Sequence, residues 1–72
     1  MKKTELIKNA INQAVEIVDC FGDTSRGWLV MGHNDPKGTY LLLPFDPTLV
    51  IWCYKPSHIK HIRFLFNGHR LW

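Results

Sequence analysis

The residues that could do chemistry gather in the last third of the chain. Residues 47–72 carry four lysines and arginines, three of the four histidines and no acidic residue. Residues 1–46 carry five basic and six acidic residues, so the net charge of +3 comes entirely from the C-terminal third. A basic segment with interleaved aromatic residues favours partners that carry negative charge, such as nucleic acids or acidic protein surfaces.

Some side chains in this segment are of the types that bind zinc, namely Cys53, His58, His61 and His69. Structural zinc sites usually present paired ligands, such as two cysteines separated by two residues, and the sequence contains no such pair. His58 and His61 are three residues apart, so they would point to opposite faces of a strand. We therefore expect no metal and no other cofactor.

The enzymatic activity that fits these residues best is metal-independent RNA cleavage. A histidine would act as the base, and Arg63, Lys60 or Arg70 would stabilise the charge that develops on the phosphate. The sequence lacks the motifs of nucleophile elbows, phosphate-binding loops, zinc proteases and dinucleotide-binding folds, and Cys20 has no histidine near it in sequence. We expect the chain not to be an enzyme. A small ribonuclease is the third of the three functions considered, after a protein-binding module and a nucleic-acid-binding protein.

Binding of single-stranded DNA or RNA is the second alternative. The C-terminal strand supplies rings that could stack on bases and cations that could hold phosphates. Alternation along a strand works against this role, because it places Phe64 and Phe66 opposite His61 and Arg63, where the rings would fill the core. The residues concerned are Tyr54, Lys55, Lys60, His61, Arg63, Phe64 and Phe66.

The elements that must position these residues begin with a predicted helix. From Thr4 to Phe21 the apolar residues recur at helical spacing and occupy about half of the helix circumference. Thr4 suits the N-cap, and Gly22 suits the left-handed position just past a helix end. The pattern predicts a surface helix over residues 4–21.

Four segments rich in β-branched and aromatic residues follow, at residues 28–33, 39–45, 49–54 and 60–66. Turn-forming residues separate them, so consecutive strands are expected to pair in antiparallel fashion. The predicted fold class is α+β, with an N-terminal amphipathic helix packed on a four-stranded antiparallel β-meander (α-β-β-β-β). Residues 1–72 are expected to form a single small domain.

Loop lengths suggest the strand registers. A loop over 34–38 would set His33 opposite Thr39, and a turn over 55–59 would set Tyr54 opposite Lys60. The first register places Leu29, Met31, Leu41 and Leu43 on one face and Trp28, Val30, Tyr40 and Leu42 on the other. The second groups Val50, Trp52, Ile62, Phe64 and Phe66 on one face.

Both faces of the predicted sheet are apolar, and a single helix about 10 Å wide cannot cover both. We expect a second copy of the chain or a protein partner to cover the second face, because exposed apolar patches usually mark interfaces. The alternative is that the C-terminal tail, residues 67–72, folds back and covers this face with Leu71 and Trp72.

The composition excludes several classes of protein. Hydrophobic residues make up 46% and charged residues 21%, values typical of globular proteins and not of disordered ones. No apolar run approaches the roughly 20 residues of a membrane span, and the N-terminal residues do not resemble a signal peptide. Two cysteines are too few for a secreted disulfide scaffold. We therefore expect a cytoplasmic protein without a membrane partner.

These observations favour a small non-catalytic protein-binding module. It would be an accessory or inhibitor protein, a kind that phages and mobile elements often encode, and would dock on a larger protein through its apolar sheet face and basic C-terminal rim. The residues expected to bind the partner are Trp28, Tyr40, Ile51, His61, Arg63, Leu65, Arg70 and Trp72.

Overall fold

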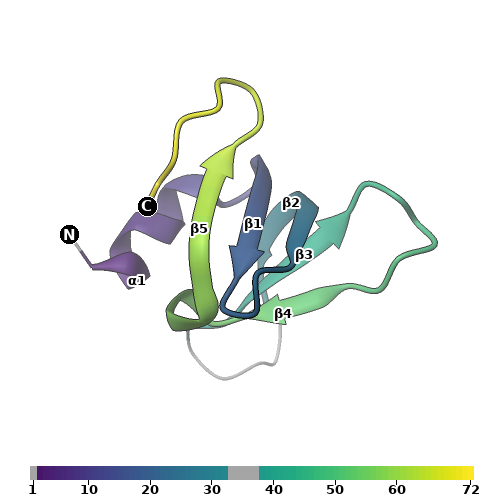
Figure 1. Cartoon of the computed structure of the whole chain (residues 1–72), viewed down its shortest axis with the longest axis horizontal. Coiled ribbons are helices and arrows are strands. Elements are labelled where there is room, and N and C mark those ends of the chain that lie inside the picture. Colours follow the sequence, from purple (N-terminus) through teal and green to yellow (C-terminus); the bar gives the residue numbers. More distant parts are fainter. Residues whose placement is uncertain (1, 33–37) are drawn as a thin grey trace.

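A short helical segment begins the chain, and five antiparallel strands follow it (Figure 1). The computed structural model describes residues 2–32 and 38–72. Its strands form one sheet in the order β4-β3-β2-β1-β5. The predicted α+β class is confirmed, although the sheet has five strands instead of four. In chain order the elements are α1 (Lys3–Leu6), the 3₁₀ helix η1 (Ile7–Ala10), β1 (Ala14–Asp19), β2 (Thr24–Met31), β3 (Tyr40–Pro44), β4 (Trp52–Tyr54), the 3₁₀ helix η2 (Pro56–His58) and β5 (Ile59–Phe64).

The N-terminal helix is much shorter than the sequence predicted. Helical backbone ends at Ala10, and Asn12 has a φ of 65°, a left-handed conformation that a right-handed helix cannot continue through. The predicted helix over 4–21 is wrong beyond this point, because residues 14–19 form β1. The apolar positions of β1 recur every two residues, and they also fall on one half of a helical wheel. Within the described part of the chain, no helix has the length and apolar character that a membrane span requires.

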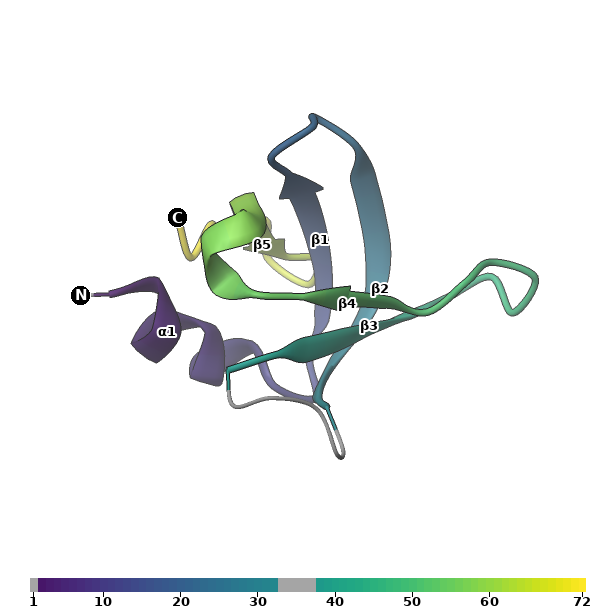
Figure 2. The ribbon, with the colours of Figure 1, turned by 90° about the horizontal axis from the view of Figure 1, so that it is seen from below.

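The sheet curls around one hydrophobic cluster, with its concave face toward that cluster. In Figure 2, β3 and β4 cross β1 and β2 at a steep angle, and the helical segment lies on the concave side. The 3₁₀ helix η1 contributes Ile7 and Ala10 to the cluster, whereas α1 buries no residue. The side chains buried in the cluster are Ile7, Ala10, Val15, Ile17, Leu29, Tyr40, Leu42, Tyr54, Ile59 and Ile62.

β2 and β3 pair one residue away from the predicted register. Leu29 lies opposite Leu42, whereas the predicted register would have set it opposite Leu43. The loop over residues 34–37 and the predicted pair partner His33 lie outside the described residues. Because side chains alternate between faces, this shift regroups the two strands. The convex face receives Trp28, Val30, Leu41 and Leu43.

β5 does not pair with β4, so the predicted hairpin between Tyr54 and Lys60 is wrong. β5 pairs with β1 at the other side of the sheet. The connection contains η2, which begins at the buried Pro56 and is tied to the β1–β2 turn by a hydrogen bond of 3.1 Å from Cys20 N–H to His58 O. Pro56 has no N–H with which to continue a strand ladder, which favours a turn at this position.

The C-terminal tail runs along the outer edge of β5. Ile62 N–H donates to Trp72 O at 3.3 Å, and Leu71 N–H donates to Ile62 O at 2.8 Å. The indole N–H of Trp72 donates to Ile59 O at 3.1 Å, and the side chains of Leu71 and Trp72 pack against the hydrophobic cluster. The tail therefore folds back as the alternative prediction proposed, but it pairs with the edge strand β5 and packs against the hydrophobic cluster. It does not cover the convex face of the sheet, which points away from this cluster.

Candidate functional site

The convex face of the sheet carries an apolar half, formed by β2 and β3. Cross-strand pairing places Trp28 beside Leu43 and Val30 beside Leu41. Trp28 is 49% exposed, and its ring meets that of Phe45 edge-on, with ring centres 5.6 Å apart. We call these five residues the apolar half. Apolar surface of this kind on a small protein usually marks an interaction site.

The other half of the convex face carries a row of three arginines, which we call the basic row: Arg26 on β2, Arg63 on β5 and Arg70 in the tail. Strand pairing places Glu16 between Arg26 and Arg63, and Arg70 lies opposite Arg63 in an isolated bridge. A guanidinium nitrogen of Arg70 lies 3.3 Å from Nδ1 of His61. Arg26 and Arg63 thus share one carboxylate, and the row of three cations stays positively charged.

Glu16 holds the basic row in place. Arg63 donates two hydrogen bonds to its carboxylate, at 2.8 and 3.1 Å, and Arg26 Nε donates a third at 2.7 Å. The hydrogen bonds from Arg63 lower the pKa of Glu16 most, the bond from Arg26 adds to this, and together they bring it from 4.5 to about 2. The hydrogen bond to Glu16 in turn raises the pKa of Arg63. Glu16 is therefore ionised at neutral pH and fixes two guanidinium groups on the convex face.

The connection between β3 and β4 projects from the body of the molecule (Figure 1), and we call residues 45–51 the arm. Asp46 organises its tip, because its carboxylate accepts hydrogen bonds from the Thr48 hydroxyl at 2.7 Å and the Thr48 N–H at 2.9 Å, which lower the pKa of Asp46. The arm returns to the sheet through consecutive apolar residues that are each more than half exposed: Leu49, Val50, Ile51 and Trp52.

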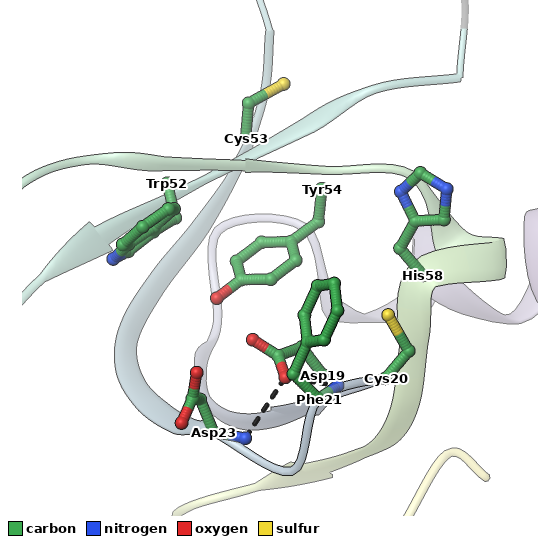
Figure 3. A pocket seen from close by; sticks show the side chains of 8 residues that line it. All are labelled: Asp19, Cys20, Phe21, Asp23, Trp52, Cys53, Tyr54 and His58. Carbon is green, nitrogen blue, oxygen red and sulfur yellow. Dashed lines mark hydrogen bonds between the residues drawn. The ribbon is translucent and has the colours of Figure 1, made fainter.

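A pocket of about 380 Å³ lies between β4 and the turn that joins β1 to β2 (Figure 3). Asp19 lines it, but its Oδ1 accepts hydrogen bonds from Phe21 N–H and Asp23 N–H, so this carboxylate holds the turn together. Trp52 lines this pocket and also a neighbouring groove of about 670 Å³ beneath the arm. The remaining residues that line the pocket are Cys20, Phe21, Asp23, Cys53, Tyr54 and His58.

The structure brings several of the predicted partner-binding residues to the convex face. Trp28 lies in its apolar half, Arg63 and Arg70 form two thirds of the basic row, and His61 lies beside Arg70. Ile51 lies on the arm and is 58% exposed.

The other predicted partner-binding residues are less accessible. Tyr40 is only 5% exposed, so its assignment to a binding surface is corrected: the shift in register turns it into the core. Trp72 is half-buried against the hydrophobic cluster. Leu65 is half-buried as well, and its N–H donates to Ala14 O at 3.0 Å.

Sequence reasoning missed Trp52 and Phe45 as surface residues. Trp52, which was expected to share an apolar face with Ile62 and Phe64, is 55% exposed at the base of the arm, and Phe66 from the same predicted face is also exposed. The signal was present in the sequence, since the run from Leu49 to Trp52 does not alternate as a half-buried strand would. The exposed arm accounts for this run.

The histidines are spread over the molecule. His58 lines the pocket beside the β1–β2 turn together with Cys20 and Cys53, whereas His61 lies beside Arg70 on the convex face. Cys20 and Cys53 are exposed free thiols. Among residues 2–32 and 38–72, no three histidine, cysteine or acidic side chains lie close enough together to hold a metal ion.

No protein-family model matches the chain, and neither the curated proteins nor the solved structures contain a match to it.

Proposed function

We propose that this chain is a small non-catalytic module that docks on a larger protein through the convex face of its sheet, acting as an accessory or inhibitor protein. The observation that carries the proposal is that the apolar half and the basic row share the convex face and that the exposed apolar arm adjoins it. Many of the other large apolar side chains of the sheet are packed in the hydrophobic cluster. Trp28 and Ile51 are each about half accessible to solvent. Exposing apolar surface to water does not stabilise an isolated chain, so we interpret this surface as an interaction site.

The chemistry of the convex face defines the partner. Trp28 and Phe45 provide the aromatic anchor that commonly dominates the energy of protein interfaces. The basic row lies at the side of this anchor and would steer an acidic rim toward it. The partner is therefore a protein surface with an apolar pocket bordered by aspartate and glutamate.

Binding of single-stranded nucleic acid is the second candidate, supported by the three arginines of the basic row and by Phe66, which is 70% exposed. Glu16 does not separate the two readings, because its carboxylate occupies donors of Arg26 and Arg63 that a phosphate or an acidic side chain would equally need. The apolar half has no counterpart in a phosphate backbone, which favours the protein partner.

A titration with matched variants tests the proposal. A partner that the tagged chain retains from a lysate of the source organism would be purified and titrated calorimetrically with three forms of the protein. We expect Trp28→Ser to weaken binding by about thirtyfold or more, as a central aromatic anchor does. Phe66→Ser removes an exposed ring that contacts Phe64, a residue packed against the hydrophobic cluster, and should leave the affinity unchanged. Equal affinities for all three forms would contradict docking through the convex face.

A further inference from the structure

The two edges of the sheet differ in how they are protected. β5 is one edge, and the tail lies along it through backbone hydrogen bonds such as Phe64 N–H to His69 O at 2.9 Å. β4 is the other edge, and within the described residues no strand pairs with its outer side. An open edge presents a row of unpaired backbone donors and acceptors to other chains.

Hydrogen bonds elsewhere in the sheet show which groups this open edge presents. Leu29 N–H donates to Gln13 O at 3.1 Å, so the backbone groups of Leu29 point toward β1. Neighbouring residues of a strand direct their backbone groups to opposite sides. Those of Val30 therefore point toward β3, where Val30 pairs with Leu41.

The same alternation carries across β3 to β4. Because the groups of Leu41 point toward β2, those of Leu42 point toward β4, where Leu42 pairs with Trp52. The backbone groups of Trp52 thus face β3. Those of Cys53 and Ile51, its neighbours, face away from the sheet at its open edge.

The side chains along this edge do nothing to prevent pairing with another strand. Natural edges are usually protected by lysine, proline or inward-pointing charge, or by a very short edge strand. Residues 49–54 contain no lysine, proline or charged residue, and the nearest ones, Pro47 and Lys55 with Pro56, stand outside the segment at its two ends. β4 itself has only three residues, so the edge long enough to pair includes the residues that lead into it. The pairing of β3 with β4 extends only to Trp52, and Leu49 N–H donates to Asp46 O at 3.1 Å. Within the described residues, residues 50 and 51 therefore extend the open edge without a pairing strand.

We infer that the open edge pairs with the same edge of a second copy of this chain, β4 against β4 in antiparallel orientation. The segment is uncharged along its whole length, so pairing it with itself sets no like charges opposite one another. The strand order keeps the basic rows apart, because Arg26, Arg63 and Arg70 lie on β2, β5 and the tail, away from the joined edges.

This pairing makes one continuous sheet of ten strands, with both convex faces on the same side. The dimer would then present two docking surfaces side by side to a partner. That consequence rests on the proposed function, whereas the pairing itself depends only on the open edge.

Sedimentation equilibrium across protein concentrations tests the pairing. We expect the wild-type chain to reach twice its 8.4 kDa mass. Ile51→Pro removes an outward-pointing N–H and no bond of the β3–β4 ladder, so it should fold and weaken dimerisation by at least about tenfold. Ile51→Val keeps both the N–H and the β-branched side chain and should dimerise as the wild type does.

Far-UV circular dichroism and thermal unfolding show whether each variant folds. If Ile51→Pro does not fold, Ile51→Lys takes its place, because it puts a charge on the open edge and should give a folded monomer. A wild-type chain that stays monomeric at several hundred micromolar overturns the pairing, as does a folded Ile51→Pro or Ile51→Lys that dimerises like the wild type. A wild-type chain that is monomeric but still binds a partner through Trp28 contradicts the pairing and leaves the proposed function standing.

Discussion

Glu16 shows how a single side chain prepares the convex face. Without it, Arg26 and Arg63 would be long, mobile cations, and ordering them on binding would cost conformational entropy. Hydrogen bonds of 2.7 and 2.8 Å to the carboxylate already hold both guanidinium groups in the free protein. Among the described residues, the side chain of Arg70 contacts His61 and no carboxylate, so it is the member of the basic row most able to move toward an acidic partner.

The pH dependence of stability follows from the lowered pKa of Glu16. A carboxyl group whose pKa is lower in the folded than in the unfolded chain stabilises the fold above its unfolded pKa and loses that contribution as the pH falls through its folded pKa. With values of 4.5 and about 2, the contribution of Glu16 is complete above pH 4.5 and disappears toward pH 2. Urea unfolding at a series of pH values should therefore show Glu16→Gln less stable than the wild type at neutral pH, with the difference shrinking in acid. A difference that does not change with pH would contradict this role.

Gly27 permits the close approach of β2 to β3. A Cβ atom at this position would collide with the backbone carbonyl of Leu43, whose carbon would lie only 2.7 Å away. Backbone in the middle of a sheet cannot move aside cheaply, so Gly27→Ala should lower the free energy of unfolding by at least about 2 kcal/mol. Met31→Ala alters an exposed residue of the same strand and should change the free energy of unfolding by no more than about 0.5 kcal/mol. Urea denaturation measures both, and similar stabilities for the two variants would contradict the close approach.

At the scale of elements, the C-terminal tail stabilises the edge of the sheet. Trp72 contributes an indole hydrogen bond to Ile59 O and a half-buried ring, over which the Lys3 ammonium lies at 5.4 Å. Trp72→Phe should lower the free energy of unfolding by about 1 kcal/mol, because the indole hydrogen bond is lost. Trp72→Ala should lower it by about 2 to 3 kcal/mol, which is less than the roughly 3 to 5 kcal/mol expected when a fully buried aromatic residue is truncated. Chemical denaturation of the two variants checks this order, and a Trp72→Ala variant as stable as the wild type would show that the tail does not hold the edge.

Elements with a distinctive local pattern could be predicted from the sequence. The strand segments around Trp28, Leu42, Tyr54 and Ile62 and the α+β class follow from β-branched and aromatic runs between turn residues. The helix was overextended because Val15 and Ile17 satisfy two periodicities at once, and only the partners of β1 on both sides decide between them. A local hydrophobic pattern does not show which distant segments will pair with a strand.

The convex face could be predicted only in part, for the same reason. Arg63 and Arg70 could be identified from charge alone, and Trp28 from its residue type. Tyr40 was misplaced because a shift of one residue in the β2–β3 register exchanges the two faces. Trp52 was assigned to the core because the projection of the arm depends on where β3 stops, at Pro44, which lacks the N–H to extend the ladder.

At the scale of the whole molecule, the position of the charge matters more than its sum. The net charge of +3 alone suggests a nucleic-acid partner. The fold instead concentrates arginines beside an apolar surface, ties two of them to Glu16 and keeps the open edge of the sheet uncharged. This distribution suits a protein partner better than a phosphate backbone.

The most direct test of this account is to identify what the tagged wild-type chain retains after nuclease treatment and washing at moderate salt, by mass spectrometry. We predict that one defined protein survives both treatments and is lost when Trp28→Ser replaces the wild type. Recovery of nucleic acid before nuclease treatment and of no specific protein after it would contradict the proposed function.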